Sequence, residues 1–325
     1  MRAIQVNDST PERDLRVVDV SMPSCSEEEV LINVHAAGVN RADLMQRDGK
    51  YPPPPGESPI LGLEVAGVVE RVGAHVVDFA RGERVCALLA GGGYAECVAV
   101  NAGQVMKLPA VLSFDEGAGL PEAFITAFTN LFVEGQLQSG ETVLIHGGSS
   151  GVGTAAIQLA KSAGAQVACT VANETKAAAC RKLGADCVAL YGSEDFEKVV
   201  RSWSANGINV ILDCVGGGYL ARNVALLAPH GRLVLIASMG GASGQLDIPT
   251  LMKKRGKIIG SVLRSRSSQE KSALVGKFRN QFLDRFASGE LRVVVDSVFP
   301  LAKAVDAHQR MKSSEHVGKI ILTVR

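Results

Sequence analysis

The sequence has little net charge and no long apolar segment, and each shortage excludes a class of protein. Its 325 residues carry a net charge of +1, so it lacks the basic balance that favours nucleic-acid binding. No run of about 18 apolar residues occurs, so we expect no membrane-spanning helix. The first residues contain no signal-peptide core, so a cytoplasmic location is the default expectation.

Paired cysteine motifs are also missing. The seven cysteines are scattered, and none forms a C-x-x-C pair. A dispersed, odd set is typical of free thiols in a reducing compartment. A zinc site needs about four clustered nitrogen or sulfur ligands. We therefore interpret these cysteines as ordinary free thiols and expect no metal site. The alternative interpretation is that some of them form a metal site or provide a catalytic thiol.

One stretch organises the rest of the chain. Residues 143–145 form a short apolar run, typical of a buried parallel strand, and residues 154–161 have apolar residues at helical spacing. The turn between them resembles the dinucleotide fingerprint G-x-G-x-x-G, with a serine at the middle position. A helix N-terminus after such a turn can bind pyrophosphate. The predicted contact residues are Gly148, Ser149, Ser150, Gly151, Val152 and Gly153.

The segments on either side differ in character. Residues up to about 109 are rich in strand patterns and predict a barrel-like unit. From residue 143 onward, strands alternate with helices, which favours a parallel sheet with helices on both faces. The fold class is therefore α/β. By the switch-point rule a cofactor would lie at the carboxyl ends of the strands, where glycine-rich segments 215–218 and 238–241 also fall.

Three polar residues stand out in the strand-rich part. Asn40 or Arg41 could cap a short helix, and Asn40 is the better candidate chemically. Tyr51 borders a loop of four consecutive prolines, where it either packs on a rigid surface loop or lines a pocket. Glu64 lies in an apolar stretch, so a buried carboxylate there needs a partner, which a nearby arginine or lysine could supply.

The combined motifs resemble the medium-chain dehydrogenase/reductase superfamily, in its zinc-independent quinone oxidoreductase (zeta-crystallin-like) branch, near the p53-inducible NADPH:quinone reductase type. The resemblance covers essentially the whole chain. It implies a GroES-like catalytic domain over 1–121 plus 266–325 and an NADP-binding Rossmann domain over 122–265. The motifs lie at residues 38–44, 61–67, 82–85, 92–96, 144–153, 182–185 and 318–320.

Two departures from the zinc alcohol dehydrogenases argue against zinc. Those enzymes place a cysteine where this chain has Asn40 and a histidine where it has Leu63. Neither replacement supplies their metal ligands. The cysteine-rich structural-zinc lobe is missing as well.

The resemblance also assigns residues to the cofactor. The position that is acidic in NAD enzymes is Val171 here. Lys176 could face a 2′-phosphate or be a solvated helix lysine, and Glu174 argues against a phosphate. We predict NADPH over NADH. Further implied cofactor residues are Asn40, Thr126, Tyr191, Ser238, Met239, Gly240, Leu263, Arg264, Ser265 and Lys319. Alternatively, Lys319 could be a charge at a strand edge, and Arg264 could be a surface charge.

The predicted activity is NADPH-dependent reduction of quinones by hydride transfer without zinc, with ortho-quinones favoured. Asn40 and Tyr51 are the candidate catalytic residues, whereas His146 is interpreted as a packed histidine. A reductase of alkenal or enoyl double bonds is the rival enzyme, and a non-catalytic NADPH- or RNA-binding protein is the rival of another class. We also expect a homodimer, in which residues 233–237 and 258–263 could be pairing edge strands.

Overall fold

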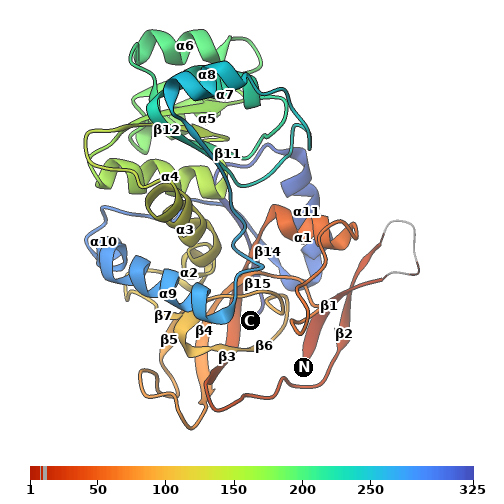
Figure 1. Ribbon diagram of the computed structural model, residues 1–325. Coiled ribbons are helices and arrows are strands. Elements are labelled where there is room, and N and C mark those ends of the chain that lie inside the picture. The colour runs from red at the N-terminus through yellow and green to blue at the C-terminus, as the bar shows by residue number, and fades with distance from the viewer. Residues whose placement is uncertain (8, 10–12) are drawn as a thin grey trace. The chain divides into compact units, whose positions relative to one another are not determined.

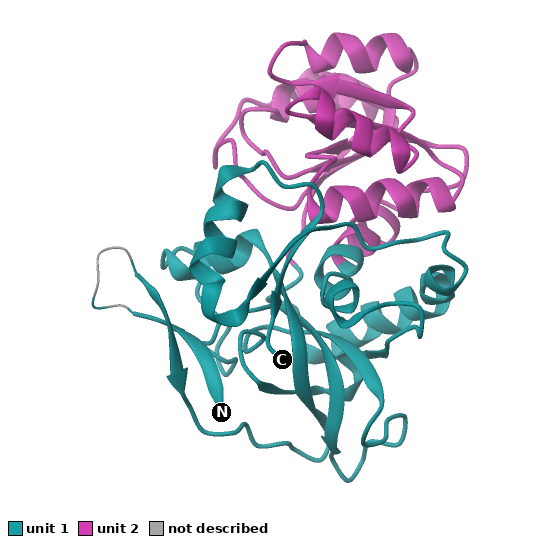
Figure 2. Cartoon of the chain, turned by 180° about the vertical axis from the view of Figure 1, so that it is seen from behind, with its two compact units in different colours: residues 1–125, 263–325 teal, residues 126–262 magenta. Residues whose placement is uncertain are grey.

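Two compact units make up the chain. The computed structural model describes residues 1–7, 9 and 13–325 (Figure 1). Unit 1 comprises Met1–Ile125 and Leu263–Arg325, and unit 2 comprises Thr126–Val262 (Figure 2). Unit 2 is therefore inserted in the chain between two parts of unit 1, and the first border falls inside helix α3 (Pro121–Phe128).

Unit 1 is built on a seven-stranded sheet. Its order is β14-β15-β3-β4-β5-β7, with β6 paired to β3. The ladders are antiparallel except that between β14 and β15. An antiparallel ladder joins β1 to β2. The strands are β1 (Arg2–Val6), β2 (Leu15–Asp19), β3 (Glu29–Val39), β4 (Glu64–Val72), β5 (Arg84–Leu88), β6 (Cys97–Asn101), β7 (Val105–Lys107), β14 (Val295–Pro300) and β15 (Lys319–Thr323).

Short helices accompany this sheet. Asn40 is the N-cap of the first, so the predicted cap is confirmed. The final strand β15 returns to the first unit, as expected, and lies between β14 and β3. The helices are α1 (Arg41–Arg47), η1 (Ala102–Gln104), α2 (Phe114–Ala118), α9 (Ser268–Phe278), η3 (Arg279–Leu283), α10 (Asp284–Ala287), η4 (Leu301–Lys303) and α11 (Ala304–Ser313).

Unit 2 is a doubly wound parallel sheet of order β10-β9-β8-β11-β12-β13. In Figure 1, α4 lies on one side of it and α7 and α8 on the other. The predicted α/β alternation is thereby confirmed. The elements are η2 (Thr129–Glu134), β8 (Thr142–His146), α4 (Gly151–Ser162), β9 (Gln166–Val171), α5 (Glu174–Lys182), β10 (Cys187–Leu190), α6 (Phe196–Trp203), β11 (Ile208–Asp213), α7 (Leu220–Leu226), β12 (Leu227–Leu235), α8 (Ile248–Lys254) and β13 (Lys257–Gly260).

The middle of unit 2 is apolar on both faces of the sheet. Val143, Leu144 and Ile145 of β8 are fully buried, which explains the continuous apolar run. One expectation about the sheet is wrong. Residues 233–237 do not form an edge, because β12 pairs with both β11 and β13. Only β13 is an edge strand on that side.

Within the described part of the chain, no helix is both long and apolar enough to cross a membrane.

Candidate functional site

The glycine-rich turn of unit 2 leads from β8 directly into α4. Ser150 is the N-cap, and its Oγ accepts a 3.0 Å hydrogen bond from the N–H of Gly153. The Ser150 carbonyl accepts from the N–H of Thr154 at 2.8 Å. The N–H groups of Gly151 and Val152 have no acceptor among the described residues. The helix start therefore presents unpaired donors and a positive dipole end, which suits pyrophosphate.

Sterics explain the two outer glycines of the fingerprint. A Cβ at Gly153 would lie 2.3 Å from the carbonyl oxygen of Gly147, and a Cβ at Gly148 would lie 2.7 Å from Sγ of Cys169. A larger residue at Gly153 would displace the backbone of the turn, and one at Gly148 would displace the side chain of Cys169. The serine at the middle position caps the helix, which a glycine cannot do with a side chain. Whether the turn's serine hydroxyls also bind phosphate stays a prediction.

The other predicted cofactor residues of unit 2 follow the carboxyl ends of strands. Lys176 lies in the first turn of α5 after β9, and Tyr191 follows β10. Because β8, β9 and β10 are neighbours, these two residues lie at the same carboxyl end of the sheet as the glycine-rich turn. Thr126 lies in α3 and is half-buried. Three exposed residues follow β12, namely Ser238, Met239 and Gly240.

The surroundings of Lys176 bear on cofactor choice. The residue is buried, so the alternative of a solvated helix lysine is wrong. Val171, at the end of β9, is also buried and offers no carboxylate to a ribose. Glu174 forms an ion pair with Arg181. This pairing neutralises the acidic group that would disfavour a 2′-phosphate.

A buried polar network beneath the turn was not apparent from the sequence. His146 Nε2 lies 2.8 Å from Asn223 Oδ1, and His146 Nδ1 lies 3.1 Å from Thr170 Oγ1. Asn223 Nδ2 donates to Asp213 at 3.0 Å, and Asp213 accepts from the N–H of Val215 at 2.6 Å. Burial lowers the pKa of His146, so the ring is neutral. The interpretation of His146 as a packed histidine is confirmed, and its network joins the ends of β8, β9 and β11.

In unit 1, Asn40, Glu64 and Lys319 form a buried cluster. The Lys319 ammonium lies 2.6 Å from Glu64 Oε1, 2.7 Å from Asn40 Oδ1 and 3.0 Å from the carbonyl oxygen of Val39. Asn40 Nδ2 donates to Glu64 Oε1 at 2.9 Å. Glu64 is 0 % exposed and Lys319 4 % exposed, so each charge depends on the other.

This cluster settles two questions left by the sequence. The partner of Glu64 is a lysine, although one from the far end of the chain. Lys319 is not a strand-edge charge, because β15 is paired on both sides. Its ammonium has three acceptors inside unit 1, and contact with the cofactor stays a prediction. The second amide N–H of Asn40 has no acceptor among the described residues, so it can donate to a ligand.

Asp43, which the sequence did not single out, holds the backbone of Asn40. Its carboxylate accepts from the N–H of Asn40 at 2.8 Å, from the N–H of Gly62 at 3.1 Å and from the hydroxyl of Tyr94 at 3.1 Å. Burial outweighs these hydrogen bonds and raises the pKa of Asp43 to about 6. The Tyr94 hydroxyl also lies 3.2 Å from His308 Nε2.

Tyr51 lies against Arg264. The guanidinium carbon of Arg264 is 5.2 Å from the centre of the Tyr51 ring, and Nη1 donates to the Tyr51 carbonyl at 3.3 Å. Nε donates to the carbonyl of Ala90 at 2.8 Å, and Nη2 to Gln46 Oε1 at 2.6 Å. Arg264 is 4 % exposed, so it is not a surface charge. It ties the proline loop, α1 and the end of β5 together.

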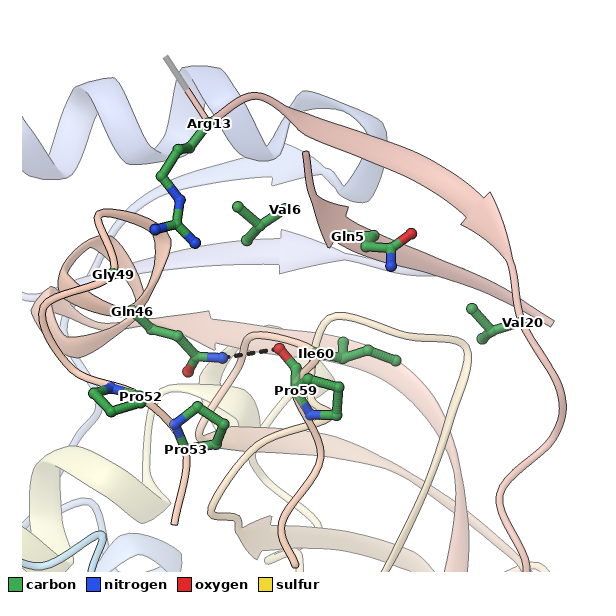
Figure 3. A pocket seen from close by; sticks show the side chains of 10 residues that line it. All are labelled: Gln5, Val6, Arg13, Val20, Gln46, Gly49, Pro52, Pro53, Pro59 and Ile60. Carbon is green, nitrogen blue, oxygen red and sulfur yellow. Dashed lines mark hydrogen bonds between the residues drawn. The ribbon is translucent and has the colours of Figure 1, made fainter. Parts of the chain in front are cut away.

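Gln46 links this arrangement to a cavity of about 370 Å³. Its Nε2 donates to the carbonyl of Pro59 at 2.9 Å, as the dashed line in Figure 3 shows. Pro52 and Pro53, which follow Tyr51 in the chain, line the same cavity. The proline loop therefore borders the cavity and is bound to Arg264 through Tyr51.

Glu122, at the start of α3, is a further residue that the sequence did not reveal. Its N–H donates to Glu64 Oε2 at 2.8 Å. Burial and the neighbouring charge of Glu64 raise the pKa of the Glu122 carboxyl to about 8. This group is therefore largely protonated at neutral pH.

The structure thus brings the predicted residues together in three groups. Asn40 and Lys319 share one cluster in unit 1, and Tyr51 and Arg264 share another. The residues on either side of Arg264 differ, since Leu263 is buried and Ser265 exposed. In unit 2, Thr126 lies in α3, and the other predicted residues follow the carboxyl ends of strands. Among the described residues, no three or more His, Cys, Asp or Glu side chains are arranged to hold a metal ion.

Comparison with known proteins identifies the class. Residues 26–110 match the alcohol dehydrogenase GroES-like domain, and residues 151–278 match the zinc-binding dehydrogenase family. Together with relatives aligned along the full chain, these matches show that the chain belongs to the medium-chain dehydrogenase/reductase superfamily of oxidoreductases. The expected GroES-like and Rossmann-type folds are confirmed.

Three individual proteins illustrate which oxidoreductases this chain is similar to. The chain is 33 % identical over 329 residues to the quinone oxidoreductase of Lama guanicoe, covering 100 % of this chain and 98 % of the relative. A mycobacterial protein solved in complex with NADPH is 30 % identical, with a TM-score of 0.87 and 100 % of both chains covered. The enoyl reductase CurK is 26 % identical, with a TM-score of 0.87, covering 100 % of this chain and 99 % of that one.

Proposed function

We propose that the protein is an NADPH:quinone oxidoreductase that works without zinc. The observation that carries the proposal is the orientation of Asn40. Lys319 holds its amide oxygen and Glu64 one of its N–H groups, so the second N–H is fixed as a donor. A fixed donor stabilises the negative charge that develops on a carbonyl oxygen as it accepts hydride.

The residues at the carboxyl ends of the unit 2 strands fit a nicotinamide dinucleotide. Gly151 and Val152 offer free amides for pyrophosphate. The buried lysine after β9 and the neutralised Glu174 favour a 2′-phosphate over a free ribose diol. When bound, the cofactor supplies the hydride. NADPH bound to a structural relative adds support.

The residue types around Asn40 indicate the substrate class. Where the zinc alcohol dehydrogenases have metal ligands, this chain has an amide and Leu63. Hydrogen bonds from Asn40 and Tyr51 polarise a carbonyl less than a metal ion does. Acceptors that need little activation, above all ortho-quinones, therefore suit the site. The overall change is quinone plus NADPH plus one proton to hydroquinone plus NADP⁺.

Reduction of an enone or enoyl double bond is the second candidate, because an enoyl reductase is among the structural relatives. A non-catalytic NADPH- or RNA-binding role would instead leave cofactor binding without turnover. The net charge of +1 does not favour RNA binding.

The free thiols of all seven cysteines agree with a cytoplasmic location.

The test is oxidation of NADPH with 9,10-phenanthrenequinone, with and without a chelator and with NADH in parallel. Rapid, NADPH-selective and chelator-insensitive turnover is expected. Turnover of crotonyl or alkenal substrates alone would assign the protein to the second candidate. Loss of activity with the chelator, restored by zinc, would contradict metal independence.

We also propose a homodimer formed through β13. This strand is the edge of the unit 2 sheet, and pairing with a second copy would satisfy its free backbone groups. Light scattering after size exclusion should give twice the mass of the 34.1 kDa chain. A monomer mass at micromolar concentration would contradict the proposal.

A further inference from the structure

Asp43 holds the main chain at two places in the Asn40 cluster. Its Oδ2 accepts from the N–H of Asn40 at 2.8 Å, and its Oδ1 accepts from the N–H of Gly62 at 3.1 Å. Gly62 lies two residues before Glu64, whose carboxylate accepts from the Asn40 amide. One carboxyl therefore fixes the backbone at Asn40 and close to Glu64, which are the two partners of the hydrogen bond that orients the Asn40 side chain.

Two further buried side chains extend this arrangement into a chain of hydrogen bonds. The Tyr94 hydroxyl lies 3.1 Å from Asp43 Oδ2 and 3.2 Å from His308 Nε2, and the two rings meet edge to face. Asp43 and Tyr94 are 0 % exposed, and His308 is 2 % exposed. Because Tyr94 follows β5 and His308 lies in α11, the chain joins α1 to α11 through the interior of unit 1.

The direction of the protons in this chain follows from the groups that form it. An ionised carboxyl can only accept, so the Tyr94 hydroxyl donates to Asp43, and the Tyr94 oxygen accepts from His308. Burial lowers the pKa of His308 to about 3, so the ring is neutral, and we assign its single N–H to Nε2. Nδ1 of this ring has no hydrogen-bond partner among the described residues, which agrees with the assignment.

The charge of Asp43 depends on these hydrogen bonds, because Asp43 forms no ion pair among the described residues. Lys319 favours the carboxylate from a distance, but its ammonium binds Glu64 at 2.6 Å. Burial raises the pKa of Asp43 to about 6, although the three hydrogen bonds act in the opposite direction. The other charged or titratable groups that act on the chain are Arg47 of α1, Glu64 of β4, Glu122 of α3, Arg264, and the neutral Tyr94 and His308.

We propose that Asp43 is a positioning residue of the reduction, and that Tyr94 and His308 hold it as a carboxylate so that Asn40 stays aligned with the acceptor. The inference rests on the proposed reductase function. Asp43 acts through Asn40, because a hydrogen bond to a charged acceptor is about twice as strong as one to a neutral acceptor. The His308 N–H polarises the Tyr94 hydroxyl, which makes this hydroxyl a better donor to the carboxylate.

The proposal predicts how the rate depends on pH. Protonation of Asp43 weakens its hydrogen bonds to Asn40 and Gly62, so kcat should fall as the pH falls through about 6. In D43N the side chain keeps its size but cannot ionise. We expect kcat to fall by about tenfold to a hundredfold through misplacement of the Asn40 amide. The limb near pH 6 should disappear, and the dissociation constant of NADPH should not change.

Y94F separates this role from a contribution to folding alone. The Tyr94 hydroxyl lowers the pKa of the Asp43 carboxyl, so its loss should move the acid limb to higher pH, by roughly one pH unit for one hydrogen bond to a charged group. H308L should move the limb in the same direction by less, because the hydroxyl remains. At pH 9, where Asp43 is ionised in each of these proteins, both variants should reach nearly the wild-type kcat.

The experiment compares kcat with 9,10-phenanthrenequinone from pH 5 to 9 for the wild type, D43N, Y94F, H308L and the control D78N. Asp78 is exposed, and D78N should match the wild type at every pH. A Y94F profile that is lowered equally at every pH would overturn the proposal, as would a D43N profile that keeps the limb. So would a wild-type profile that is flat between pH 5 and 7, a result that needs no variant to fold. An H308L profile identical to the wild type would overturn the part assigned to His308.

A second measurement does not depend on turnover. The backbone amide nitrogen resonance of Asn40 should titrate with a midpoint near pH 6 in the wild type, at a higher pH in Y94F and not at all in D43N. If it titrates in this way but no quinone is reduced, the chain of hydrogen bonds exists, whereas the reductase function fails and the role of Asp43 fails with it. If quinone is reduced and the resonance does not follow the acid limb, Asp43 does not position Asn40.

Discussion

Lys319 and Glu64 form an ion pair of 2.6 Å between the last strand of the chain and β4. Both side chains are almost fully buried, and Asn40 hydrogen-bonds to each of them. The pair therefore keeps two buried charges satisfied, and in the proposed mechanism it also fixes the amide of Asn40.

Removing one partner of this pair should destabilise the protein more than removing both. K319M leaves the buried Glu64 carboxylate without a cationic partner and should lower the unfolding free energy by about 3–5 kcal/mol. The double variant E64Q/K319M should recover part of this loss, because no charge is left buried. Denaturant unfolding measures both. Equal losses for the single and double variants would contradict the coupling.

Arg264 should act on the acceptor side of the reaction. Because its hydrogen bonds hold Tyr51, Gln46 and Ala90, R264A should lower kcat/KM for quinone by about tenfold to a hundredfold through misplacement of the tyrosine. The dissociation constant of NADPH, followed by cofactor fluorescence, should change little. A large rise in that constant would instead support the predicted cofactor contact.

Lys176 should discriminate between the two nicotinamide cofactors. K176A removes the buried cation after β9, so KM for NADPH should rise by about tenfold or more, as for the loss of one charge-assisted hydrogen bond, while KM for NADH changes less. The exposed Lys182 on the same helix provides the matched control K182A. A parallel change for both cofactors would indicate a role in folding of the helix alone.

Protonation of Glu122 should also be visible in stability. Its ordinary pKa of 4.5 rises to about 8 in the folded protein. Between these values the folded state binds more protons than the unfolded state, so the unfolding free energy contributed by this group falls as the pH rises. E122Q does not titrate there. Its Tm should therefore match the wild type near pH 5 and exceed it near pH 9, as measured by calorimetry at both pH values.

Local patterns were sufficient for part of this molecule. The strand–turn–helix at residues 143–161 depends on apolar periodicity and on turn residues within a short window, and it was predicted correctly. The cap at Asn40 is equally local. The need of Glu64 for a partner could be predicted from its apolar neighbours, because an unpaired buried carboxylate is costly.

The identity of that partner could not be predicted from the residues around it. Lys319 approaches Glu64 only because β15 pairs with β3, a contact between distant parts of the sequence. The same holds for Arg264, whose acceptors lie in three separate segments. The acidity of Glu122 depends on neighbours from several elements, so no single stretch contains it. The edge position assigned to residues 233–237 was wrong because strand order, too, is decided by tertiary pairing.

The insertion of unit 2 within unit 1 has a consequence for biosynthesis. Strands β3 and β4 leave the ribosome long before β15, which must lie beside β3 to complete the sheet. Unit 2 is a continuous segment and has all its strands as soon as Val262 has been added. Glu64 therefore has no lysine partner while the inserted unit is made, and the nascent protein exposes an unfinished sheet edge until β15 has been synthesised. Emergence of β15 from the ribosome, rather than synthesis of the N-terminal half, is then the step at which unit 1 becomes native.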